Sequence, residues 1–217
     1  MSEQEMPTQE MIRVESHNIP LVTEHKGAST NVSYTDPIPL NESVLALKDP
    51  SMHVIEIKPT EQYPKGILSI YLSSTEDGKQ KPIGYIVFNW QAEDPKKALL
   101  SINFMRTKNA TAQIAEAPEP LRELAASGNV FDALRVEPSA QGKGLGKLLM
   151  LAGMEQMRIK GFDQIQISGD LTIGLESGAD SFYSKYGAVP DQAGHEVIRT
   201  DLALQYGEYL SAVFAKK

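Results

Sequence analysis

The sequence contains no cysteine. This absence excludes disulfide bonds, metal sites built from thiolates and a cysteine nucleophile. Residues 1–7 are acidic and lack the basic and apolar regions of a signal peptide. The longest apolar run, 148–154, is far shorter than the roughly 20 residues that cross a bilayer. We therefore expect a cytoplasmic protein that does not enter the membrane.

Positive charge is in the minority, with 21 Lys and Arg against 28 Asp and Glu and a formal net charge of −7. Because a nucleic-acid surface generally needs clustered Lys and Arg, we expect no nucleic-acid partner. A negative field favours cationic partners such as amines, although acidic proteins often use such a charge only for solubility. The histidines have no metal-ligand spacing, so we predict no metal site and interpret each as a surface or packing residue: His17, His25, His53 and His195.

The length of 217 residues and the 41% hydrophobic content are typical of a single soluble domain, which we place at 1–217. Residues 1–50 are weakly patterned and interrupted by prolines, with a short strand at 11–14 and a helix at 41–47. Residues 107–128 are longer than a hairpin connection needs and form an insertion.

The middle of the chain has the pattern of antiparallel strands. Alternating residues at 53–58 predict one strand, and two β-rich runs at 67–73 and 83–90 flank an Asp77-Gly78 pair that favours a hairpin turn. Residues 99–105 predict a further strand, and 118–127 predict a short helix closed by Gly128.

The second half alternates between strands and helices. We predict strands at 130–136, 162–168 and 196–204, and helices at 142–160 and 179–186. A strand–helix–strand unit beside hairpins indicates an α/β fold with a mixed, mostly antiparallel sheet and helices on both faces.

A glycine-rich turn joins the strand at 130–136 to the following helix. Such a turn exposes backbone N–H groups at the positive end of the helix dipole, an arrangement that suits a diphosphate. Gln141 stands where a P-loop needs its first glycine, and Lys147 stands where a Rossmann fingerprint needs its third. Both nucleotide motifs are therefore excluded.

The pattern of this turn resembles motif A of the GNAT family of N-acetyltransferases; it consists of Val136, Pro138, Gln141, Gly144 and Gly146. The resemblance implies that backbone amides of this loop bind the coenzyme A pyrophosphate, from Gln141, Gly142, Lys143, Gly144, Leu145 and Gly146. It also implies that the strand residues Leu134 and Val136 face the pantetheine arm, and that a backbone N–H near Val136 stabilises the oxyanion. The alternative is a glycine-rich turn that binds nothing.

Residues 182–188 resemble the end of motif B of the same family, so the resemblance covers 130–188 closely. It implies that Tyr183 lies near the coenzyme sulfur and protonates the leaving thiolate. The alternative is that Tyr183 only packs its helix on the sheet, which is the role we assign to Tyr186. Ala188 replaces the usual phenylalanine, Glu176 replaces a frequent asparagine, and the link 169–178 is unusually long.

The resemblance also implies a general base on the strand before the loop, or a water leading to one. Asp132 shares a face with Val130, Leu134 and Val136, so it is either a buried base with a raised pKa or a solvated residue at the strand start. Glu137 is interpreted as a solvated loop residue. Trp90 either lines the acceptor pocket or packs in the core.

The resemblance thus implies acetyl transfer from acetyl-CoA to a primary amine by direct attack, the amine being a small molecule or a protein lysine or N-terminus. The acyl carrier would lie in an opening between the strands at 130–136 and 162–168. The competing interpretation is a non-catalytic GNAT-like module that binds acyl-CoA or a protein. The insertion at 107–128 forms either a lid or surface decoration, and apolar residues at 206–214 would suit a homodimer interface.

Overall fold

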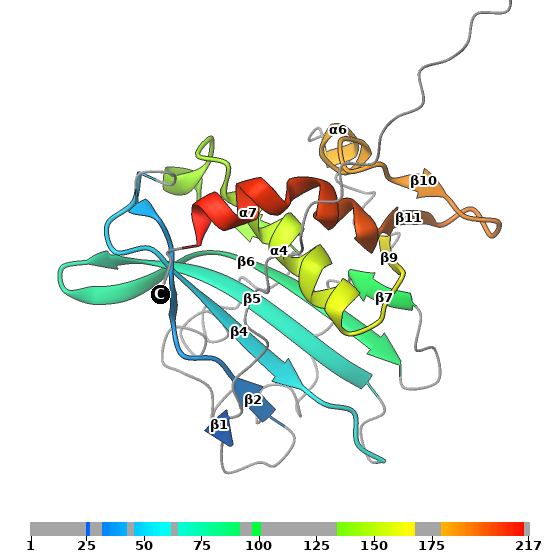
Figure 1. Ribbon diagram of the computed structural model, residues 1–217, viewed down its shortest axis with the longest axis horizontal. Helices are drawn as coiled ribbons and strands as arrows, with labels where there is room; N and C mark the ends of the chain where they lie inside the picture. The colour runs from blue at the N-terminus through cyan, green and yellow to red at the C-terminus, as the bar shows by residue number, and fades with distance from the viewer. Residues whose placement is uncertain are drawn as a thin grey trace, which may run out of the picture.

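The computed structural model describes residues 25–26, 32–42, 46–61, 65–91, 97–100, 134–167 and 179–214. These residues build one mixed sheet of eleven strands (Figure 1). The strands are β1 His25–Lys26, β2 Val32–Tyr34, β3 Ile38–Pro39, β4 Ser51–Ile57, β5 Lys65–Glu76, β6 Lys79–Gln91, β7 Lys97–Leu100, β8 Leu134–Val136, β9 Gln164–Ile167, β10 Val189–Pro190 and β11 Glu196–Arg199. The helices are η2 Pro138–Ala140, α4 Leu145–Ile159, α6 Ala179–Ser184, η4 Thr200–Tyr206 and α7 Gly207–Val213.

The order across the sheet is β1-β2-β4-β5-β6-β7-β9-β11-β10, with β3 beside β4 and β8 beside β6. In the described residues β7 and β9 are parallel, and the other neighbours are antiparallel. The mixed, mostly antiparallel sheet predicted from the sequence is therefore confirmed.

The centre of the sheet is the long hairpin of β5 and β6. Its turn lies at Asp77 and Gly78, whose φ angles of 51° and 74° are both left-handed. A two-residue turn of that kind matches the twist of the flanking strands, which explains why the Asp-Gly pair predicted it. The predicted strand at 53–58 is also present, as β4, and both of its faces are buried.

Helix α4 covers one face of this hairpin (Figure 1). An ideal Cβ on Gly153 would lie 2.4 Å from the Phe88 ring, so this glycine lets the helix approach β6 closely. The helices η4 and α7 pack against α4. The predicted helix at 118–127 lies outside the described residues, so helical cover of the other face stays a prediction.

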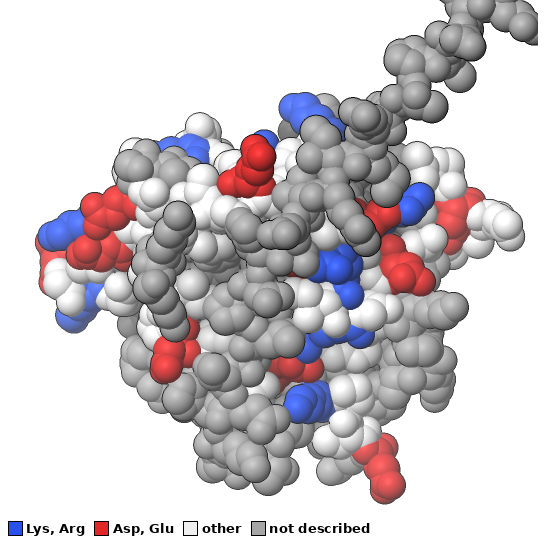
Figure 2. Space-filling model, in the orientation of Figure 1, with Lys and Arg blue, Asp and Glu red and all other residues white. Residues whose placement is uncertain are grey.

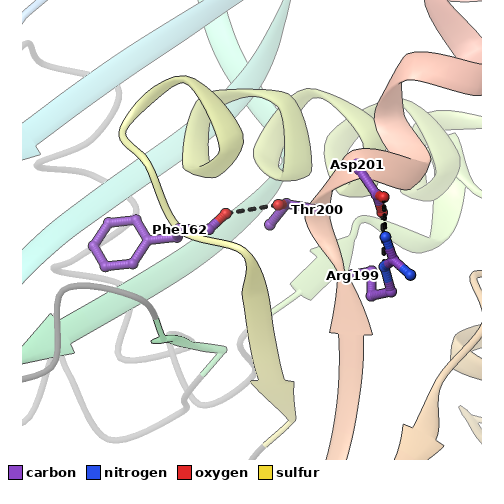
Figure 3. A network of polar contacts seen from close by, with 4 residues as sticks. All are labelled: Phe162, Arg199, Thr200 and Asp201. Carbon is purple, nitrogen blue, oxygen red and sulfur yellow. Dashed lines mark hydrogen bonds and ion pairs between the residues drawn. The ribbon is translucent and has the colours of Figure 1, made fainter.

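The end of β11 corrects the predicted strand at 196–204. The strand ends at Arg199, and residues 200–206 form the 3₁₀ helix η4 instead. The Thr200 hydroxyl donates to the Phe162 carbonyl at 2.6 Å, and Arg199 pairs with Asp201 across the turn (Figure 3). These contacts turn the chain away from the sheet, so that the apolar residues of 202–206 face α4 rather than a neighbouring strand.

The C-terminal segment is part of this chain's own core. Leu210 and Val213 are buried, and Phe214 pairs with Leu40 near the start of the described chain. The apolar residues that suggested a homodimer surface at 206–214 are therefore largely used within the chain, and the homodimer stays a prediction without that support.

Basic and acidic side chains are interspersed over the face shown in Figure 2. In the part of the chain that the structure describes, no helix is both long enough and apolar enough to span a membrane. The predicted strand at 11–14 and the insertion at 107–128 lie outside the described residues.

Candidate active site

Strand β8 precedes the glycine loop, and it lies along β6 together with β7. We call β7 and β8 together the composite strand. The register pairs Leu99 and Leu100 of β7 with Asn89 and Phe88, and it pairs β8 with residues 84–86. Strands β7 and β8 therefore follow one another on the same edge of β6. Strand β9 pairs with β7 and β11, and in the described residues it has no pairing with β8, so the opening between 130–136 and 162–168 stays a prediction.

The outer edge of β8 offers backbone hydrogen-bonding groups. The N–H of Glu137 donates to the Ile83 carbonyl at 2.9 Å, which fixes the alternation along the strand. In an antiparallel ladder the backbone groups of Leu134 and Val136 then point away from β6. Within the described residues β6 is the strand that pairs with β8, and the Val136 carbonyl accepts from Gln141 Nε2 at 3.1 Å. The remaining outward groups can pair with an extended ligand.

The loop after β8 is shaped by one proline and two glycines. Pro138, at the first position of η2, ends the strand and starts a single 3₁₀ turn. Gly142 and Gly144 have φ angles of 76° and 79°, a backbone conformation that residues with a Cβ rarely adopt. The predicted helix at 142–160 accordingly begins later, at Leu145.

This loop leaves the N-terminus of α4 open. The N-cap residue is Gly144, which has no side chain to accept a hydrogen bond from the first N–H groups. The first turn carries no acidic residue. The first N–H groups of a helix need external partners, and they sit at the positive end of the helix dipole. Gly142, Lys143 and Gly144 are exposed, and in the described part of the chain no atom beyond the neighbouring residues lies within 4 Å of an ideal Cβ on Gly142. The arrangement suits an oxyanion with several acceptor oxygens.

Helix α6 brings Tyr183 to this region. Phe182 lies 3.6 Å from an ideal Cβ on Gly146, so α6 packs beside the first turn of α4. Tyr183 is 8% exposed, and its ring contacts the Phe182 ring edge-on, with the two ring centroids 5.3 Å apart. Tyr186 also packs on Phe182, and burial, with smaller contributions from Tyr206 and Tyr209, raises its pKa to about 12. The predicted packing role of Tyr186 fits these contacts.

A group that the sequence analysis did not identify lies beside the loop. Lys147 Nζ lies 4.8 Å from the ring centroid of Tyr206 and 4.7 Å from that of Tyr209. The Tyr209 hydroxyl is 3.9 Å from an ideal Cβ on Gly144. No local sequence signal joins these tyrosines to the loop, because they come from η4 and α7, about sixty residues downstream.

The other residues that the sequence analysis singled out lie elsewhere in the structure or outside its described part. Asp132 lies outside the described residues, and Glu137 is half-buried. Trp90 is in the core, tilted against Phe162. His53 is buried, as expected for a packing residue. The described part of the chain holds no group of three His, Cys, Asp or Glu that would suit a metal.

The family model described as "Acetyltransferase (GNAT) family" matches residues 49–188. The chain belongs to the GNAT acetyltransferase family. The matched region contains the composite strand, the glycine loop, α4 and Tyr183, whereas Tyr206 and Tyr209 lie beyond it.

No curated protein is significantly similar to this GNAT chain in sequence. Among solved structures, a variant of the cAMP-binding acyltransferase from Mycobacterium smegmatis is similar, with 12% identity and a TM-score of 0.39. The alignment covers 81% of this chain and 55% of that one, so the chain spans about half the length of that protein.

Proposed function

We propose that this protein transfers an acetyl group from acetyl-CoA to a primary amine by direct attack in a ternary complex. The observation that carries the proposal is the junction of β8 with the glycine loop. There the outward backbone groups of Leu134 and Val136 lead into an uncapped helix terminus. A ligand with an extended amide arm and a diphosphate fits that junction, and membership of the GNAT family favours acetyl-CoA.

The chain's own backbone would hold both parts of acetyl-CoA. In the loop, Gly142, Lys143, Gly144, Leu145 and Gly146 would direct N–H groups to the diphosphate, whereas the Gln141 N–H donates to the Pro138 carbonyl at 3.3 Å. The outer edge of β8 pairs with the pantetheine arm, as a further strand would. Gln141 orients the edge through its hydrogen bond to the Val136 carbonyl. Acetyl-CoA supplies the acyl group as an activated thioester.

Three groups would serve the transfer itself. Asp132, or a water leading to it, takes a proton from the ammonium form of the acceptor, because only the neutral amine is nucleophilic. The N–H of Val136 stabilises the oxyanion that forms at the acyl carbonyl. Tyr183 gives its phenol proton to the departing thiolate. The sequence has no cysteine to form a covalent acyl-enzyme.

The acceptor class follows from the reaction. It is a primary amine, on a small molecule or at a protein lysine or N-terminus, and the net charge of −7 favours the approach of such cations.

The test is release of free thiol from acetyl-CoA in the presence of a panel of amines. Tyr183→Phe should lower kcat about a hundredfold with little change in the Kd for acetyl-CoA, because it removes a proton donor and leaves the ring. Tyr186→Phe is the matched control in the turn that follows the same helix, and it should retain most of the activity. Unchanged kcat in Tyr183→Phe and in Asp132→Asn would refute these roles. Saturable acetyl-CoA binding without thiol release for any amine would instead indicate the non-catalytic GNAT-like module.

A further inference from the structure

Lys147 is in an unusual place for a lysine. It is the third residue of α4, where the positive end of the helix dipole disfavours a cation by up to about 1 kcal/mol. The described residues provide no ion pair for it, and its contacts are the two tyrosine rings at 4.8 and 4.7 Å. Both rings stabilise the ammonium group by cation–π contact, which offsets the unfavourable dipole.

The two tyrosines hold this cation beside the loop. Tyr206 comes from η4 and Tyr209 from α7, and both helices pack along α4. The Tyr209 hydroxyl lies 3.9 Å from an ideal Cβ on Gly144, the N-cap of α4. Burial raises the pKa of Tyr209, so its phenol keeps its proton at neutral pH and can donate a hydrogen bond. An ammonium group and a phenol O–H are therefore placed at the edge of the uncapped helix terminus.

Packing alone does not explain this choice of residues. An apolar side chain at position 147 would fill the space between two rings without setting a positive charge against the helix dipole. An anion at the loop reverses that balance, because Lys147 and the helix terminus then attract the same charge. Phosphate oxygens have the charge and the acceptor capacity to satisfy Lys147 and Tyr209 together.

We propose that Lys147, positioned by Tyr206 and Tyr209, binds a phosphate group of coenzyme A, with the Tyr209 hydroxyl as a second donor. The proposal rests on the proposed function, since it concerns the same acyl carrier. It assigns a ligand-binding role to the C-terminal segment, which lies outside the matched residues 49–188. The phosphate is either in the diphosphate or at the 3′ position of the ribose, and both share the chemistry that these residues recognise.

The test is calorimetric titration of the purified full chain with coenzyme A at several salt concentrations. Lys147→Met removes the charge and keeps the chain length, and it should weaken binding by roughly ten- to a hundredfold. It should also reduce the salt dependence of Kd, which a purely structural lysine would not change. Tyr209→Phe keeps the ring over Lys147 and should weaken binding by about three- to tenfold, whereas Tyr209→Leu removes ring and hydroxyl and should weaken it further.

Lys79→Met is the control, because it makes the same change of charge at the tip of the β5–β6 hairpin. It should bind coenzyme A as the unaltered protein does. Dephospho-coenzyme A identifies the phosphate: if the loss in Lys147→Met disappears with this probe the partner is the 3′-phosphate, and if it persists the partner is the diphosphate. Equal Kd values and salt slopes for the unaltered protein and Lys147→Met would overturn this inference alone. Failure of the unaltered protein to bind coenzyme A would overturn the proposed function with it.

Discussion

Acidification should destabilise the protein through His53. This imidazole lies on the sheet face opposite α4, stacked on Tyr71 with ring centroids 4.3 Å apart. The Ser73 hydroxyl donates to Gln80 Oε1 at 2.5 Å, and Ser73 Oγ lies 3.0 Å from His53 Nε2. Ser73 can therefore accept a hydrogen bond from neutral His53. Protonation would place a second N–H and a charge in a buried site.

The magnitude follows from the pKa of His53, which burial lowers from 6.5 to about 4. Each pKa unit corresponds to about 1.4 kcal/mol, so the full effect is about 3 kcal/mol. Because the folded-state pKa lies below the unfolded one, this stability is present above pH 6.5. It is lost as the pH falls toward 4, where the unfolded chain binds the proton more tightly. Between pH 7.5 and 5 the expected loss is about 2 kcal/mol.

The assay is urea unfolding of the unaltered protein and of His53→Gln at pH 7.5 and pH 5. Glutamine can still hydrogen-bond to Ser73 but does not titrate, and the remaining titrating groups contribute equally to both proteins. The unaltered protein should lose about 2 kcal/mol more than the variant on acidification. If the two proteins lose the same free energy of unfolding, the reasoning about His53 is wrong.

Two further predictions concern packing around α4. Lys160→Met should lower the free energy of unfolding by about 3 kcal/mol, because it leaves Glu56 buried without its 2.6 Å partner. Adding Glu56→Leu should restore much of the lost free energy, as measured by urea unfolding. If Lys160→Met alone leaves the free energy of unfolding unchanged, the pairing with Glu56 is contradicted. Gly153→Ala should cost about 2–3 kcal/mol by thermal unfolding, since its Cβ would meet the Phe88 ring. Gly161→Ala, strained at φ 88° but with no contact to its Cβ among the described residues, should cost only about 1 kcal/mol, and an equal cost at both sites would refute the close contact.

The parts of the fold and site that the sequence predicted depend on local chemistry. The Asp77-Gly78 turn needs left-handed backbone at both positions, and these residues tolerate it. Gly142 and Gly144 produce the loop for the same reason, and Gly161 ends the helix at φ 88°. Each signal acts within a few residues, so the sequence alone contains it.

The parts that the sequence did not predict depend on contacts between distant segments. Strands β7 and β8 share one edge of β6, and no local pattern records which strand lies beside β9. Residues 200–206 have enough apolar side chains for a strand, but contacts with α4 and the Thr200 hydrogen bond to Phe162 select a 3₁₀ helix. The approach of Tyr206 and Tyr209 to Lys147 is likewise a tertiary contact.

The most direct test of the central claim is calorimetric titration with acetyl-CoA, with NADPH as the comparison ligand. We expect saturable binding of acetyl-CoA and none of NADPH. Gly144→Val should weaken binding at least about tenfold, because a side chain at φ 79° distorts the loop and holds the phosphates away. Gly78→Val, equally strained at φ 74° in the distant hairpin turn, should bind acetyl-CoA normally. Absence of saturable acetyl-CoA binding, or equal binding by Gly144→Val, would contradict the assignment of this loop to the acyl carrier.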